Sequence, residues 1–453
     1  MASLDPASTA TQLATAYTKS AQDQITARTT AAQRTTTGLT TLKTALSAFD
    51  TAVSGLSGGV NKGLRQFSAT FATTGIGTAT ATAAAQAGTY SFFVEQLATS
   101  QQVVFEDLPA VPVAFGGPLA VQLADGSSFT VNLVTADNDS DGVISQAEIA
   151  RAINQANGNQ GKATASVLTV NGDTQLVLSA GASGANGAIA LDTSGLPAGT
   201  LKDAFDAPHE LVAAQDAIVW LGGQGGVKLQ QASNTFTSIA GVSATFTRAM
   251  SAGEAPVTLT VAADSAGTAG NVQKFVDAYN ALEKALDGLT SVGDAEAGTA
   301  SAVFASDAGI RSLRSRLNTI LRQDFGGKTL MDLGVKADRN GSLTLDAARL
   351  DKALVADPDA LNKVFGSASL TAGSGLLGAM DTYLDVWLKS GSGQVSSRQA
   401  SVQVVQKDLA ARQLRLDAQY DNLYERYLKQ FSQLQSLQMQ MSETSSLFST
   451  VSA

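Results

Sequence analysis

The 453-residue chain has no cysteine, a single histidine and no apolar run long enough to span a bilayer. Without cysteine it can form no disulfide framework, no thiolate metal site and no cysteine nucleophile. One histidine, His209, cannot build a histidine-rich metal site, and we expect it on a surface loop. A transmembrane helix needs about 18 or more consecutive apolar residues, so we expect no membrane insertion.

Charge and aromatic side chains are also scarce. Charged residues make up 15% of the chain, aromatic residues 6%, and the net charge is −9. No basic cluster stands out, so we expect no nucleic-acid partner. The first residues lack the basic and apolar regions of a cleavable signal peptide. We therefore expect either a cytoplasmic protein or one that is exported without such a signal.

The motifs of several enzyme classes are missing as well. No G-x-S-x-G nucleophile elbow occurs. The glycine-rich run LGGQGGVKL (221–229) fails as a phosphate loop, because Lys228 does not directly follow the last glycine and Leu229 replaces the Ser or Thr. We expect a turn between strands over this run. Because these motifs are missing, we expect that the protein is not an enzyme.

The spacing of apolar residues changes twice along the chain. Helical three- and four-residue spacing runs from Leu39 to Val53 and returns over 272–286 and 307–322. Between them, segments such as TYSFFVEQL (89–97) and VTLTVAA (257–263) are typical of strands. This pattern predicts a multidomain α+β protein in which a β-rich region, 76–264, is inserted between helical halves.

The C-terminal segment 396–453 has the clearest period, with apolar residues near heptad a and d positions for about six heptads. The residues expected on this seam are Val402, Leu409, Leu416, Leu423, Tyr427, Leu434, Leu437 and Met441. Residues 1–40 carry only a faint stripe through Leu13, Tyr17 and Ile25, and are expected to be coil or disordered alone. Pairing of the termini would give a coiled-coil stalk with β-rich head domains. A helical bundle within one chain is the alternative.

Three ordered segments carry a family resemblance: AGTYSFFVEQLATSQQ (87–102), GNVQKFVDAYNAL (270–282) and GVKADRNGSLTLDAARLDKALVADPDALNKVFG (334–366). Together with the C-terminal heptads they resemble the flagellar hook-associated protein 2 family, and the match is weakest over 110–210. The resemblance implies a layout of terminal coil, helical leg, inserted head domains, leg and coil. Its expected parts are 1–40 (N-terminal coil), 41–75 and 265–395 (leg domain), 76–112 and 211–264 (first head domain), 113–210 (outer head domain) and 396–453 (C-terminal coiled coil).

The resemblance also implies a structural function. A family member would cap the distal tip of the bacterial flagellar filament as a homo-oligomeric ring, expected to be a pentamer, and would promote folding and insertion of exported flagellin. It would leave the cell through the flagellar type III channel. Its partners would be other copies of itself, flagellin, the hook-filament junction proteins and an export chaperone. The seam residues would then contact partners, unless they only hold the protomer's own coil. A secreted calcium-stabilised adhesin and a secreted hydrolase are the rival functions.

One further motif, DNDSDGVISQAE (137–148), matches the D-x-D-x-D-G-x₅-E pattern of an EF-hand loop. Oxygen ligands for Ca²⁺ would come from Asp137, Asp139, Asp141, the Val143 carbonyl, Ser145 and Glu148. A strand-like segment precedes the loop in place of the entering helix of an EF-hand, and the loop occurs once. Because calcium sensors use paired helices, we expect bound calcium to stabilise this loop locally and not to act as a sensor switch.

The alternative to calcium binding is an acidic turn that caps the following helix. A second Asp- and Asn-rich stretch, 336–347, has Lys336 and Ala347 at the terminal ligand positions, so we expect a hairpin there and no metal site. A helix over 347–365 is expected to follow the hairpin. No cofactor is required on this interpretation, and Ca²⁺ is the single candidate.

Overall fold

The computed structural model describes residues 5–57, 63–106, 108–170, 172–294, 296, 298–366 and 373–451. The chain forms two compact units. The helical unit comprises Met1–Gly59 and Thr268–Ala453, and the β-rich unit comprises Val60–Gly267. One unit is thus inserted between the two halves of the other, in agreement with the predicted α+β class. The β-rich unit begins before residue 76, because strand β1 (Phe67–Phe71) pairs with its last strand, β17 (Val257–Ala263).

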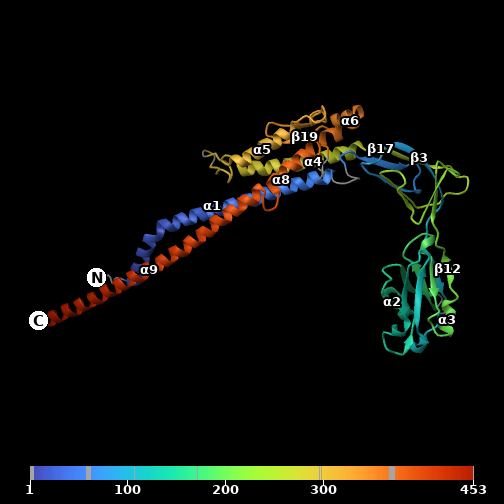
Figure 1. Cartoon of the computed structure of the whole chain (residues 1–453). Helices are drawn as coiled ribbons and strands as arrows, with labels where there is room; N and C mark the ends of the chain where they lie inside the picture. The colour runs from blue at the N-terminus through green and yellow to red at the C-terminus, as the bar shows by residue number, and fades with distance from the viewer. Residues whose placement is uncertain are drawn as a thin grey trace. The chain divides into compact units, whose positions relative to one another are not determined.

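The helical unit is built from helices of very different length (Figure 1). They are α1 (Pro6–Ser57), α4 (Ser265–Thr290), α5 (Ala308–Leu321), α6 (Ala347–Ala356), α7 (Ala360–Phe365), α8 (Gly375–Leu388) and α9 (Gln394–Val451). A cluster of rings joins three of them, since Phe49 of α1 lies 6.1 Å from Phe275 of α4, which lies 5.3 Å from Phe365 of α7. The first pair is tilted and the second edge-on, and such ring contacts add to the apolar burial that holds the helices together.

Two details of the helical unit bear on the sequence predictions. Strands β18 (Val335–Ala337) and β19 (Leu343–Leu345) form the expected hairpin, and Gly341 takes the positive φ of 90° that its turn requires. The single helix predicted over 347–365 is wrong: α6 and α7 are separate. Pro358 lies between them, and proline disfavours helical backbone in the residue before it.

The β-rich unit contains two hydrophobic cores. The first lies on a five-stranded sheet of order β1-β17-β3-β13-β14, accompanied by a three-stranded sheet of order β15-β16-β2. The remaining strands of these sheets are β2 (Gly77–Ala81), β3 (Gly88–Gln96), β13 (Ala217–Leu221), β14 (Val227–Gln231), β15 (Thr235–Phe236) and β16 (Val242–Phe246). The run 221–229 contains the turn between β13 and β14, as predicted.

The second core lies within a four-stranded sheet of order β12-β4-β10-β9, a three-stranded sheet of order β11-β6-β7 and the pair β5-β8. Its strands are β4 (Gln102–Phe105), β5 (Val111–Pro112), β6 (Pro118–Leu123), β7 (Ser128–Asn132), β8 (Val143–Ile144), β9 (Ala163–Val170), β10 (Asp173–Ala180), β11 (Ile189–Asp192) and β12 (His209–Val212). Helices α2 (Gln146–Gln155) and α3 (Thr200–Phe205) and the short 3₁₀ turns η1 (Val113–Phe115), η2 (Leu133–Thr135) and η3 (Ala185–Gly187) complete it. This core therefore extends beyond the range 113–210 expected for the outer head domain, because β4 and β12 belong to its sheet.

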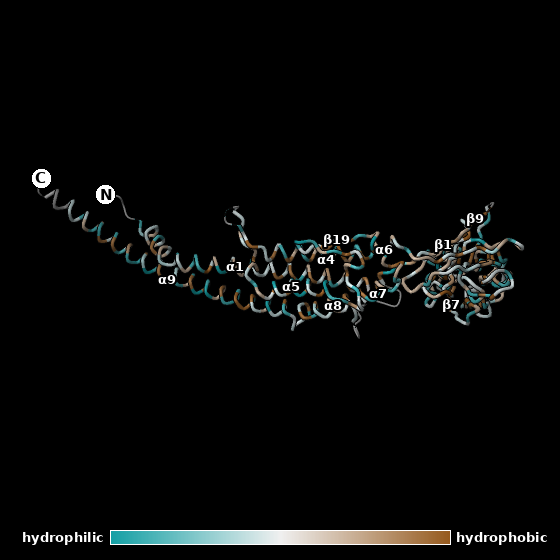
Figure 2. Tube along the Cα trace, turned by 90° about the horizontal axis from the view of Figure 1, so that it is seen from above, coloured by the Kyte–Doolittle hydropathy of each residue, from teal (hydrophilic) through white to brown (hydrophobic). Residues whose placement is uncertain are grey.

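Hydropathy follows these cores. In Figure 2 the tube of α9 alternates between hydrophobic and hydrophilic residues along its length, as expected for a helix with one apolar seam. In the part of the chain that the structure describes, no helix combines the length and the apolar character needed to cross a bilayer.

Candidate assembly surface and calcium loop

The two terminal helices pack against each other over most of α1 (Figure 1). Side-chain hydrogen bonds join Gln22 to Gln413 and Thr36 to Gln406, so residue numbers rise along α1 as they fall along α9. The helices are therefore antiparallel. The pairing of the two termini that the sequence suggested is present.

The N-terminal segment is helical from Pro6 onward, where it packs on α9. Its expected disorder in the absence of that partner stays a prediction. Threonine has a lowered helix propensity because its Cβ is branched, and within a helix its hydroxyl can donate to the carbonyl four residues earlier. The hydroxyls here do so: Thr18 donates to the carbonyl of Ala14 at 2.9 Å, and other threonines of α1 make the same bond. These threonine hydroxyl groups thus find hydrogen-bond acceptors within the helix.

The face of α1 that packs also differs from the predicted stripe. Leu13 and Tyr17 are 40% and 65% exposed, whereas Ile25 is half-buried and lines a hollow together with Leu409 of α9. The side chains buried near this end are small: Ala10, Ala14, Thr18 and Ala32. Small side chains let two helix backbones approach closely, so α1 needs no apolar stripe once α9 lies beside it.

Three residues of the predicted C-terminal seam are buried. Leu409, Leu416 and Leu423 lie one heptad apart and are 4%, 7% and 8% exposed. Leu409 and Leu416 lie beside α1, where they line hollows together with its residues. Val402 and Tyr427 are half-buried. This part of the seam holds the chain's own helix pair.

The remaining seam residues lie beyond the reach of α1. We call Leu434, Leu437 and Met441 the distal seam; they are 43%, 54% and 66% exposed. Figure 1 shows the C-terminal end of α9 extending past the N-terminal end of α1. The same apolar period therefore continues on a stretch of helix that no other described part of the chain covers. Its role in assembly stays a prediction.

Polar contacts weaken the helix pair where it is covered. The side-chain amides of Gln22 and Gln413 donate hydrogen bonds to each other, at 3.1 and 2.7 Å. Elsewhere, residues of both helices line two hollows with volumes of ≈ 440 and ≈ 310 Å³. Polar residues in such a seam specify register at a cost in stability.

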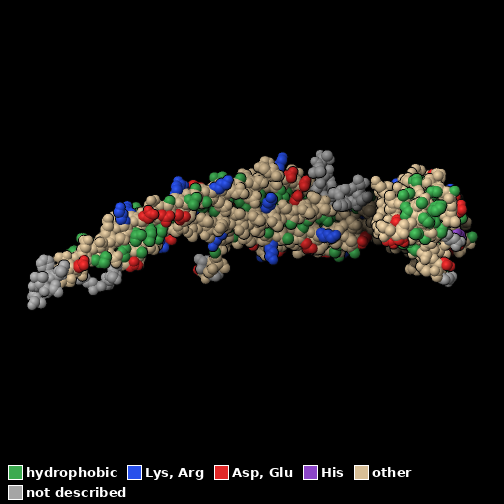
Figure 3. All heavy atoms as spheres, turned by 90° about the horizontal axis from the view of Figure 1, so that it is seen from below, with side chains coloured by type: hydrophobic (Ala, Val, Ile, Leu, Met, Phe, Trp, Pro, Cys, Tyr) green, Lys and Arg blue, Asp and Glu red, His purple; other side chains and the backbone are tan. Residues whose placement is uncertain are grey.

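On the face drawn in Figure 3 the lysine and arginine side chains are isolated from one another, so this face has no broad basic area.

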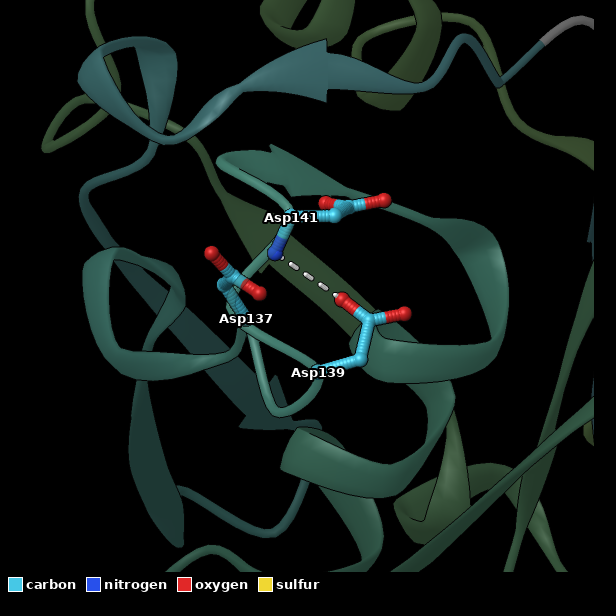
Figure 4. A group of neighbouring side chains, drawn as sticks. All are labelled: Asp137, Asp139 and Asp141. Carbon is cyan, nitrogen blue, oxygen red and sulfur yellow. Dashed lines mark hydrogen bonds between the residues drawn. The ribbon is translucent and has the colours of Figure 1, made fainter.

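The calcium-like loop lies in the β-rich unit between β7 and α2. Asp137, Asp139 and Asp141 each place an oxygen within 4.8 Å of the others (Figure 4). Backbone amides hold the carboxylates: Asp137 accepts from Ser140 at 2.7 Å and from Gly142 at 3.0 Å. Asp141 donates its amide to Asp139 at 3.2 Å, the bond drawn in the figure. Three of the predicted ligands are thus brought together.

The other three predicted ligands, Val143, Ser145 and Glu148, are not part of this aspartate group. Glu148 is 6% exposed and lies outside the aspartate group. It forms a capping box with Ser145 at the start of α2: Glu148 accepts from the Ser145 amide at 2.9 Å, and Ser145 accepts from the Glu148 amide at 3.3 Å. Val143 lies in β8, which pairs with β5.

These hydrogen bonds govern the charge of Glu148. Bonds from the amides of Ser145 and Asn138 lower the pKa of its carboxyl to about 2, so it is ionised at neutral pH. Both carboxylate oxygens of Glu148 accept hydrogen bonds: Oε2 accepts from the backbone amide of Ser145, and Oε1 from the backbone amide of Asn138 at 2.6 Å. Calcium would have to draw Glu148 out of these bonds. Calcium binding by this loop stays a prediction of the sequence.

Comparison with known proteins places the chain in a family. The model described as flagellar hook-associated protein 2 N-terminus matches residues 2–101, and that described as flagellar hook-associated protein 2 C-terminus matches 214–443. Neither match includes the calcium-like loop.

Relatives match over most of the chain. The lateral flagellar hook-associated protein 2 of Vibrio parahaemolyticus is 35% identical, covering 84% of this chain and 85% of its own length. The B-type flagellar hook-associated protein 2 of Pseudomonas aeruginosa is 29% identical, covering 90% and 88%. Among solved structures, the D1-D2-D3 domains of the flagellar cap protein FliD from Escherichia coli share the fold, with a TM-score of 0.62 and 23% identity over 81% of this chain and 99% of that one. The chain belongs to the flagellar hook-associated protein 2 family.

Proposed function

We propose that this protein caps the distal end of a bacterial flagellar filament as a ring of identical copies, and that exported flagellin folds and inserts beneath the ring. Family membership supports a structural role in flagellum assembly. It gives no support to the rival adhesin or hydrolase. The ring, its expected pentameric state and the action on flagellin are our inference, as is export through the flagellar type III channel.

The distal seam is the observation that carries the assembly role. An amphipathic helix in a protein gains most of its stability by packing its apolar face against another element. An uncovered seam therefore favours binding of a partner helix. The seam repeats the period with which Leu409, Leu416 and Leu423 pack on α1. A helix from another copy, from flagellin or from a hook-filament junction protein would extend the same packing.

The helix pair also suits export. Unfolding is required to thread a narrow channel, and the covered seam has a reciprocal amide pair and solvent-accessible hollows in place of dense apolar packing. Such an interface costs little to separate. An export chaperone would bind the same terminal helices before export.

The experiment uses a triple variant, Leu434→Gln, Leu437→Gln and Met441→Gln. Glutamine has nearly the helix propensity of leucine and methionine, so the helix should persist while the apolar seam is lost. The variant is expressed in a bacterium that lacks its own hook-associated protein 2. We expect few filaments by electron microscopy, poor swimming and flagellin released into the medium.

A matched control is available on the same helix. Val404 and Leu414 of α9 are 68% and 71% exposed but lie outside the predicted seam. The Val404→Gln, Leu414→Gln variant should assemble filaments normally. Normal filaments with the triple variant would overturn the role of the distal seam, and failure of the unaltered protein would overturn the capping function in that host.

A further inference from the structure

The four-stranded sheet of order β12-β4-β10-β9 ends at an edge strand, β9, that carries no charge. Among the described strands, β9 pairs only with β10, so its other side has no neighbouring strand. Such an edge presents backbone donors and acceptors to other chains, and proteins usually protect it with charged side chains, proline or a covering element. The opposite edge strand, β12, carries Glu210. The sequence of β9, ATASVLTV, has no charged residue and no proline.

Two asparagine side chains protect the first half of the β9 edge. The Asn159 side-chain amide donates to the Ala163 carbonyl at 2.9 Å, and its oxygen accepts from the Ala163 backbone amide at 3.0 Å. Asn154 makes the same two bonds with Ala165, both at 2.8 Å. Each asparagine therefore takes the place of a residue in a neighbouring strand, and this half of the edge is closed.

The second half of the edge is open. Backbone groups along a strand point to alternate sides, so those of Val167 and Thr169 point outward like those of the two alanines. Within the described residues, no hydrogen bond reaches them from this side. The side chains here are also accessible, since Val167, Leu168 and Val170 are 38%, 50% and 38% exposed. We call residues 166–170 the open edge.

The open edge is complementary to a second copy of itself. In an antiparallel arrangement centred on Leu168, Val167 of one copy faces Thr169 of the other, and each such pair exchanges two backbone hydrogen bonds. Leu168 then lies opposite the Leu168 of the other copy, in a non-hydrogen-bonded pair with close side chains. The chain has a net charge of −9, but neither paired strand carries a charge that would repel the other. Both asparagines keep their bonds, because the pairing ends before Ala165.

We propose that two copies of the protein associate through their open edges, joining their four-stranded sheets into one continuous sheet. The contact is two-fold symmetric, so it pairs two copies and does not propagate into a fibre. It is much smaller than the roughly 800 Å² per partner of a stable interface, so free monomers associate weakly and the contact requires a high protein concentration. It uses no residue of the distal seam and does not rest on the proposed function.

Disulfide trapping tests the register of this contact, because no native cysteine interferes. Residues opposite each other in an antiparallel pair have Cβ atoms about 4.5–5.5 Å apart, which a disulfide bridges with a small adjustment. The full chain with Leu168→Cys is oxidised at high protein concentration and analysed by non-reducing electrophoresis. We expect a disulfide-linked dimer.

The matched control is Val170→Cys, two residues further along the same exposed strand. In the proposed register Val170 lies opposite Ser166 of the other copy, about 13 Å from the second Val170 at 3.4 Å per residue. Val170→Cys alone should therefore stay monomeric. A mixture of Val170→Cys and Ser166→Cys should form the mixed dimer, a result that an unrelated extended segment bound at this edge would not give.

Two variants of Thr169 test the backbone bonds and the absence of charge. Because the Thr169 amide points outward, Thr169→Pro removes a donor of the contact and none of the β9–β10 ladder. Thr169→Lys keeps that donor and places a charge on each copy at the contact. Either change, added to Leu168→Cys, should abolish the dimer, with the melting temperature as the check on folding.

A further variant separates this contact from ring assembly. Leu168→Cys in the Leu434→Gln, Leu437→Gln, Met441→Gln background should still give the dimer, since the distal seam takes no part in it. Three results would overturn the proposal: no dimer from Leu168→Cys, an equal yield from Val170→Cys alone, or a dimer that persists with Thr169→Lys.

Discussion

Arg398, near the start of α9, holds Asp307 in a two-pronged ion pair, with nitrogen–oxygen distances of 2.6 and 3.2 Å. Asp307 is at the same time the N-cap of α5, accepting from the Ile310 amide at 3.0 Å. Arg398 also lies over the ring of Trp387 in α8, 5.6 Å from its centroid. One guanidinium therefore ties the beginning of the long helix to two helices of the core.

Replacing Arg398 by methionine should destabilise the helical unit by about 1.5–3 kcal/mol, since hydrogen bonds to charged groups are worth that much when one partner is lost. Chemical denaturation measures the change. Arg398→Lys should recover only part of it, because lysine cannot make the two-pronged bond. Arg415→Met is the control: Arg415 is exposed on α9, and among the described residues its side chain bonds to a carbonyl of its own helix. An equal loss in both methionine variants would contradict this role of Arg398.

The same pair predicts a pH dependence. Burial acts to raise the pKa of Asp307, but hydrogen bonds from Arg398 and the Ile310 amide outweigh it and hold the pKa below its ordinary value. The stability contributed by the carboxylate is thus present above the unfolded pKa of about 3.9 and is lost as pH falls through the lower folded pKa. In Arg398→Met the denaturation midpoint should fall less steeply below pH 4.

Two carboxylates, Asp50 of α1 and Asp381 of α8, should have the opposite effect. Desolvation, followed by the charges of Asp381 and Asp385, raises the pKa of Asp50. A group with a raised folded pKa is destabilising once pH exceeds that value, and the penalty disappears as pH falls below the unfolded pKa. Asp50→Asn should therefore raise the melting temperature at pH 7 and change it little at pH 3.

A double-variant comparison checks this carboxylate cluster. Asp381→Asn should also stabilise at pH 7, because the pKa of Asp381 is raised by desolvation and by Asp385. Adding it to Asp50→Asn should give less than the sum of the two gains, since each removes the same repulsion. Fully additive gains, or a loss of stability at pH 7, would contradict the repulsion.

The amide pair of Gln22 and Gln413 should set the register of α1 on α9. Gln413→Leu removes the donor to the Gln22 carbonyl, while the Gln22 nitrogen keeps its bond to Thr26, and we expect a loss of about 0.5–1.5 kcal/mol. The double variant Gln22→Leu, Gln413→Leu should regain stability by apolar contact but lose a single register. Helicity on heating and disulfide trapping between cysteines placed on the two helices measure these effects, and no native cysteine interferes. A single trapped register in the double variant would show that the amides do not specify it.

Calcium titration decides between the two interpretations of the loop. If the loop binds calcium, calorimetry of the full chain should show one site with a dissociation constant of about 10⁻⁴–10⁻³ M. Asp137→Ala with Glu148→Ala should abolish it, and Asp338→Ala, in the β18–β19 hairpin, should not. No heat up to millimolar calcium would leave the loop as a capped acidic turn.

The sequence could not make that choice, for a physical reason. Ser145 and Glu148 satisfy the S-x-x-E pattern of a capping box and also fill two ligand positions of the calcium loop. Both structures require the same residues at the same spacing. In the structure Glu148 serves as the cap, an outcome that depends on hydrogen bonds to Asn138 and Ser145 and is not encoded in the spacing.

Elsewhere, prediction succeeded where one face of an element is apolar. The helices and strands with a regular period, such as α4, α5 and β17, were identified from that period. Helix α8 was not, because Leu376, Leu377, Met380, Leu384 and Trp387 are buried together with the intervening Gly378, which leaves little contrast between faces. The periodicity of α9 likewise predicted a seam but not where it loses its partner, which depends on how far α1 reaches.

The most direct test of the central claim is sedimentation velocity of the full chain over a range of concentrations. A capping ring requires a closed assembly, so we expect the monomer to convert to one larger species of fixed size as concentration rises. The Leu434→Gln, Leu437→Gln, Met441→Gln variant shows whether the distal seam contributes to that closure. A protein that stays monomeric at every concentration, or that grows without limit, would contradict the ring.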